Sequence, residues 1–76
     1  MTYTAEAKDL RPGDAIDALP IVIEYGGDGL HAALYEYYVT ESVMPAESVG
    51  GRRAVVLYTD QGSWKIPADF EVEVLQ

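Results

Sequence analysis

The chain has 76 residues, 49% of them hydrophobic and 24% charged, so it can build one small core, and we expect a single domain over residues 1–76. It contains no cysteine, which excludes disulfide bonds, thiolate metal sites and a cysteine nucleophile. Thirteen acidic residues against five basic ones give a net charge of −8, which argues against direct binding to nucleic acid or to anionic membranes.

The first third of the chain carries short strand patterns separated by turn residues. Residues 2–7 alternate in polarity as a half-buried strand does. The Pro-Gly pair at 12–13 predicts a type II turn, because proline presets φ and glycine accepts a positive φ. We expect two more short strands over residues 15–19 and 21–25, the first of them ended by Pro20, which cannot donate a ladder hydrogen bond.

The middle of the chain is ambiguous. Residues 26–29 contain three glycines and predict either a mobile loop or a backbone that passes close to another group. Residues 35–43 alternate and are rich in aromatic and β-branched side chains, so we expect a strand there, while residues 30–34 are either a helical turn with Asp28 as its N-cap or a continuation of that strand. The helical template puts these apolar residues on one face: Leu30, Ala33, Leu34, Tyr37 and Tyr38.

The second half of the chain predicts antiparallel hairpins. Residues 44–51 resemble an exposed loop that ends in a glycine pair, and we expect them to be an arm of a hairpin. Residues 52–53 lead into three further strands, at residues 54–59, 64–66 and 70–75. Five or six short antiparallel strands in so short a chain predict a mainly β fold, a small barrel that removes most unpaired strand edges by curling on itself, with room for one short helical turn.

Two groups of residues carry a family resemblance. The order of a hairpin, Trp64-Lys65-Ile66, a break at residues 67–69 and a last strand resembles the closing half of an SH3-like β-barrel, and the turn at residues 10–14 is similar to the opening of such barrels. Residues 9–14 together with residues 59–69 also look like small uncharacterised proteins of actinobacteria and their bacteriophages. The resemblance implies a fold and a genomic setting, without an activity. The chain lacks the acidic, aromatic loop ahead of the tryptophan that proline-rich ligands require, so that ligand class is not carried over.

The sequence offers no catalytic or metal-binding constellation. His31 is the sole histidine, and no carboxylate spacing like that of an EF-hand loop accompanies it. Nucleophile motifs such as Gly-x-Ser-x-Gly are missing, and paired acids such as Glu71 and Glu73 fit a solvated strand face. We therefore expect a protein that is not an enzyme and that uses no cofactor and no metal.

The tyrosines are the most informative side chains. Tyrosine combines a large contact surface with a polar tip, which suits both the margins of a core and the centre of an interface. Because neighbouring residues of a strand point to opposite faces, at least one tyrosine of the strand over 35–43 should be exposed. The candidate binding residues are Tyr35, Tyr37, Tyr38 and Trp64.

The leading functional hypothesis is a small acidic protein-protein interaction module that binds a host or virion protein or a second copy of itself, and the resemblance suggests a bacteriophage gene as its source. The alternative is a nucleic-acid mimic whose acids block a basic DNA-binding protein. Direct nucleic-acid binding through Arg11, Arg52, Arg53 and Lys65 is disfavoured by the net charge. No apolar run approaches the roughly 20 residues of a membrane span, and no signal core is present, so we expect cytoplasmic localisation and no membrane partner.

Overall fold

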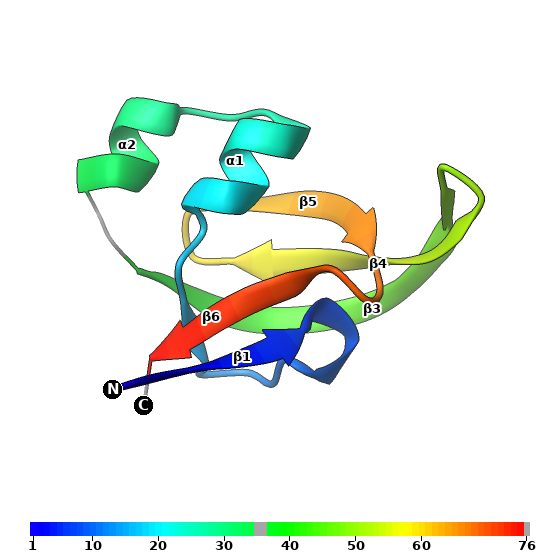
Figure 1. The fold of residues 1–76 in the computed structure, drawn as a ribbon, viewed down its shortest axis with the longest axis horizontal. Helices are drawn as coiled ribbons and strands as arrows, with labels where there is room; N and C mark the ends of the chain where they lie inside the picture. The colour runs from blue at the N-terminus through cyan, green and yellow to red at the C-terminus, as the bar shows by residue number, and fades with distance from the viewer. Residues whose placement is uncertain (35–36, 76) are drawn as a thin grey trace.

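The computed structural model describes residues 1–34 and 37–75, which form a single antiparallel sheet carrying two short α-helices (Figure 1). The sheet order is β1-β6-β2-β3-β4-β5. In chain order the elements are β1 (Thr2–Glu6), the 3₁₀ helix η1 (Ala7–Asp9), β2 (Ala15–Ile16), α1 (Leu19–Tyr25), α2 (Gly29–Leu34), β3 (Tyr38–Val49), β4 (Arg52–Thr59), β5 (Gly62–Pro67) and β6 (Glu71–Leu75).

The long strand β3 joins the two halves of the sheet. Its first residues pair with β2, and from Thr40 to Val49 it pairs with β4. Six antiparallel strands confirm the mainly β prediction. The sheet is nevertheless open, since no ladder among the described residues joins β1 to β5; instead, η1 is tied to the connection between β5 and β6 by single backbone hydrogen bonds.

The core lies between the curved sheet and α1. Side chains from strands on both halves of the sheet and from α1 are almost completely buried in it. The alternation predicted for the last strand is confirmed, because Val72 and Val74 are buried while Glu71 and Glu73 are exposed. The predicted turn at Pro12 is confirmed as well, with Gly13 at a φ of 95°. The largest fully buried side chains are Ile16, Ile21, Leu57, Ile66, Val72, Val74 and Thr40.

The strand expected over residues 21–25 is wrong, since this segment forms α1. Pro20 stands in the first turn of that helix, where its missing N–H costs nothing. Ile21 and Val22 are buried while Ile23 is exposed. The apolar surface that Ile21 and Val22 bury in the helix outweighs the preference of these β-branched residues for strands. The strand expected over residues 15–19 is correspondingly short, because β2 ends at Ile16.

Residues 44–51 form the expected hairpin arm, but they are strand over most of their length and not a loop. β3 continues to Val49, and only Gly50 and Gly51 make the turn. Proline is tolerated at position 45 because this half of β3 pairs with another strand on one side alone among the described residues.

Residues 30–34 are helical, which was one of the two structures expected for them. The described part of the strand expected over residues 35–43 begins at Tyr38.

Across the part of the chain that the structure describes, no helix is long and apolar enough to cross a membrane.

Candidate functional site

Two of the predicted binding residues fasten α1 and α2 to the sheet. Tyr38 is 3% exposed, and its ring stacks on Trp64 with 6.0 Å between the ring centroids. The Tyr38 hydroxyl lies 2.7 Å from Nδ1 of His31 in α2, and Trp64 Nε1 donates a hydrogen bond of 2.8 Å to the carbonyl of Gly26, just after α1. These contacts join both helices to β3 and β5, so Tyr38 and Trp64 anchor the helices rather than display an open contact surface.

The glycine-rich segment between the helices passes close to this anchor. A Cβ atom on Gly27 would lie 3.4 Å from Val22 and 3.7 Å from Trp64, and the φ of 133° at Gly27 is one that other residues rarely adopt. Two interpretations of residues 26–29 were open, a mobile loop or a backbone that passes close to another group. The short distances at Gly27 fit the second one. Asp28 begins α2 by accepting a hydrogen bond from the His31 backbone N–H at 3.0 Å, which is the predicted N-cap.

Both helices carry large apolar side chains that are exposed to solvent. Ile23, Leu30 and Leu34 are 74%, 71% and 69% exposed, and Tyr37, which follows α2, is 37% exposed. Leu30 and Leu34 are four residues apart on α2 and thus share one side of the helix. We call α1 and α2, which come between β2 and β3 in the chain, the insert, and these four residues the insert face. Ile23, Leu30 and Leu34 have more than two thirds of their surface in water, and apolar side chains that gather on one surface mark interaction sites.

The insert face contains one of the predicted binding residues and three that were not predicted. Tyr37 is the exposed tyrosine of the group, whereas Tyr35 lies outside the described residues. The helical spacing of Leu30 and Leu34 was visible in the sequence. Nothing in that spacing shows whether the apolar side points to the core or to solvent, and here Ala32 takes the buried position.

Acidic groups lie beside the anchor of the insert. The pKa of Tyr38 is raised, first by burial of its hydroxyl and then by the nearby negative charges of Asp28 and Asp60. Glu24 on α1 is exposed. The pKa of Tyr25 is raised, first by burial and then by the negative charge of Glu24. A partner for the insert face would therefore meet apolar side chains with acids near them.

Among the described residues, no group of three or more histidine, cysteine or carboxylate side chains could hold a metal ion. The insert carries exposed apolar side chains and nearby negative charges that a partner could contact. No protein-family model, curated protein or solved structure matches the chain.

Proposed function

We propose that the protein is a non-catalytic interaction module that binds a partner protein in the cytoplasm through the insert face. The observation that carries the proposal is the exposure of Ile23, Leu30 and Leu34 by more than two thirds on helices that Trp64 and Tyr38 hold to the sheet. An anchored apolar surface loses little conformational entropy when it is covered. In line with the resemblance to bacteriophage proteins, the partner class we propose is a host or virion protein.

The charges favour a partner with a basic rim. The chain carries a net charge of −8, and Asp28 and Glu24 are exposed close to the insert face. Like charges across an interface are unfavourable, and opposite charges speed association. We therefore propose a partner with an apolar groove flanked by lysine or arginine.

A capture experiment with matched variants tests the proposal. Tagged protein is exposed to an actinobacterial lysate, as wild type, as Leu30→Ser/Leu34→Ser and as Met44→Ser/Tyr58→Ser. The last variant removes two exposed apolar side chains from β3 and β4 and so matches the loss of apolar surface. We expect one partner that withstands high salt to be retained by the wild type and the control and lost by the insert variant.

Two results would contradict the proposal. Retention of the same partner by all three proteins would place the contact elsewhere, and a wild type that retains nothing would leave the insert face without a partner. Sedimentation of the purified chain identifies a second copy as the partner if Leu30→Ser/Leu34→Ser converts a dimer into a monomer.

The nucleic-acid mimic ranks second, because a mimic needs its acids gathered on one face. The exposed acids belong to η1, α1, β3, β6 and several turns. Release of a basic DNA-binding partner as the salt concentration rises would favour the mimic instead.

A further inference from the structure

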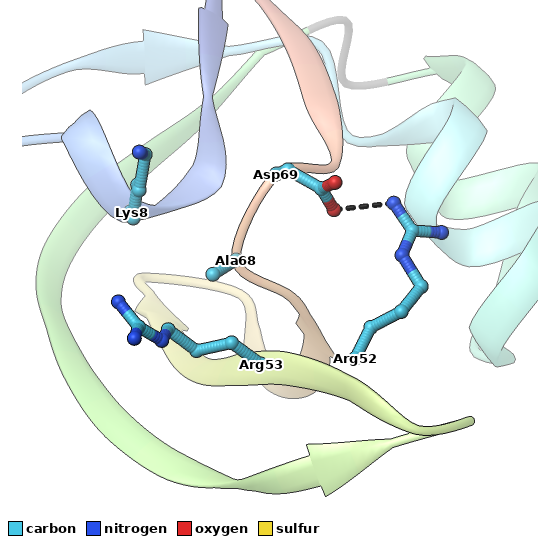
Figure 2. Close-up of a pocket in the computed structure, with 5 residues that line it drawn as sticks. All are labelled: Lys8, Arg52, Arg53, Ala68 and Asp69. Atoms are coloured by element: carbon cyan, nitrogen blue, oxygen red, sulfur yellow. Dashed lines mark hydrogen bonds and ion pairs between the residues drawn. The ribbon is translucent and has the colours of Figure 1, made fainter.

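A groove lies between η1 and the hairpin of β3 and β4, away from the residues of the insert face. It has a volume of about 460 Å³, and no residue of α1 or α2 lines it. A second hollow of about 290 Å³ adjoins it and shares Lys8, Arg53 and Ala68 (Figure 2). Lys8 of η1 and Ala68 line one side of the groove, and residues of β3 and β4 line the other.

The floor of the groove is apolar. Val43 and Pro45 of β3 pair with Leu57 and Val55 of β4, and both β4 residues belong to the core. Val55 is buried, Val43 is half-buried and Pro45 is exposed, so the exposure of the floor increases from Val55 to Pro45. An apolar side chain lying there would cover surface that water now contacts.

The groove gathers the few basic residues of a strongly acidic chain. Three of the five bases, Lys8, Arg52 and Arg53, line the two hollows. Arg52 is paired with Asp69, whereas the Arg53 guanidinium makes no ion pair or hydrogen bond with any other described residue. Lys8 has a partly exposed pair with Glu6 at 3.4 Å, and exposed pairs of this kind contribute about 0 to 1 kcal/mol, so Lys8 can exchange its partner.

Backbone hydrogen bonds fix the positions from which the two cations project. The Lys8 N–H donates to the Ala68 carbonyl at 2.9 Å, and the Ala68 N–H donates to the Arg53 carbonyl at 2.8 Å. Ala68 thus ties η1 to β4, and Figure 2 shows Lys8 and Arg53 on one side of it with the Arg52–Asp69 pair on the other. A ligand would find both cations on elements that are already held together.

We propose that this groove binds an extended acidic segment of a partner protein. A carboxylate of the segment lies between Lys8 and Arg53, and a neighbouring apolar side chain packs on Val43, Pro45 and Val55. Arginine binds carboxylates through two parallel hydrogen bonds, and most of the remaining surface repels anions, which directs an acidic segment to this groove. The segment binds by its side chains, because Pro45 removes a backbone donor that an added strand would need on β3.

The test uses two blocked pentapeptides, acetyl-Ser-Leu-Glu-Leu-Ser-amide and its counterpart with glutamine in place of glutamate. Each is titrated into isotope-labelled protein, and two-dimensional NMR follows the resonances. We expect the glutamate peptide to shift the resonances of Lys8, Arg53 and Val55, and the glutamine peptide to bind about tenfold more weakly, since a hydrogen bond to a charged group is lost.

Two arginine variants make a matched pair. Arg53→Gln should weaken binding of the glutamate peptide about tenfold, whereas Arg52→Gln, an equal change in net charge next to it, should change the Kd less than about twofold. Spectra of the unbound variants establish that both are folded. Leu30→Ser/Leu34→Ser should bind the peptide as the wild type does, which separates this site from the insert face.

Three outcomes would overturn the proposal: equal Kd values for the two peptides, an equal loss in Arg52→Gln and Arg53→Gln, or no shifts at millimolar peptide. Acetate that binds as tightly as the glutamate peptide would also overturn it, because the groove would then be a simple anion site without a role for the apolar floor.

Discussion

Trp64 holds the insert to the sheet through one hydrogen bond and one stacking contact. Its Nε1 donates to the Gly26 carbonyl at 2.8 Å, and its ring stacks on Tyr38. Trp64→Phe keeps an aromatic ring and removes the donor, so the free energy of unfolding should fall by about 1 to 2 kcal/mol. Urea unfolding followed by circular dichroism measures this change. Tyr58→Phe, at an exposed position, is the control, and equal stability of both variants would contradict the anchoring role.

The buried hydroxyl of Tyr38 makes stability depend on pH in the alkaline range. Burial, together with Asp28 and Asp60, raises the pKa of Tyr38 above its ordinary value of 10.0. The folded state then binds the proton more tightly than the unfolded state, so this contribution to stability is complete below pH 10.0 and is lost as pH rises through the raised pKa. In urea unfolding at increasing pH, the wild type should lose stability above that value more steeply than Tyr38→Phe. Parallel curves would exclude Tyr38 as the cause.

The turn between β3 and β4 requires two residues with positive φ. Gly50 and Gly51 have φ values of 58° and 76°, and Val49 pairs with Arg52 across them, as in a two-residue type I′ hairpin loop. Gly51→Val should lower the free energy of unfolding by about 1 to 3 kcal/mol, because β-branched residues are strained at positive φ.

Gly50→Asn is the matched control for this turn, since asparagine accepts the first position of a type I′ loop. It should keep the urea midpoint close to that of the wild type. If Gly51→Val were equally well tolerated, the hairpin would not depend on this turn geometry.

The elements that could be predicted from sequence are those with a strong local pattern. Val72 and Val74 alternate with glutamates, and the Pro12 turn and the hairpin from residue 52 have the residues that such structures require. α1 could not be predicted, because Ile21, Val22 and Ile23 favour strands and become helical by packing on β5 and the core. Pro20 was compatible with either structure, as the end of a strand or the first turn of a helix.

Of the insert face, only Tyr37 was among the binding residues predicted from the sequence. The tyrosine-bearing segment and Trp64 do meet, but Tyr38 faces inward, which depends on a strand register that no local pattern fixes. The exposure of Leu30 and Leu34 depends on which side of α2 packs, and a helix of six residues carries too few positions to decide that. The groove brings Lys8 and Arg53 together from distant parts of the chain, a long-range proximity without a sequence signal.

For the molecule as a whole, the net charge of −8 opposes compaction. Only two ion pairs are present among the described residues, and both are exposed, so most of the described acids have no basic partner. Added sodium chloride should therefore raise the urea midpoint as the ionic strength approaches physiological values, where the screening length is about 8 Å. Potassium chloride at the same ionic strength should raise the urea midpoint equally, because screening depends on ionic strength. A midpoint that falls with salt would show that attractive ion pairs dominate.

Hydrogen exchange of the protein, alone and in complex with the partner captured from the actinobacterial lysate, shows which elements the partner covers. We expect additional protection in the peptides that cover α1 and α2, which carry Ile23, Leu30 and Leu34, with β4 and the outer part of β3 unchanged. Exchange in α1 and α2 that is the same with and without the partner, beside new protection elsewhere in the chain, would contradict binding through the insert face.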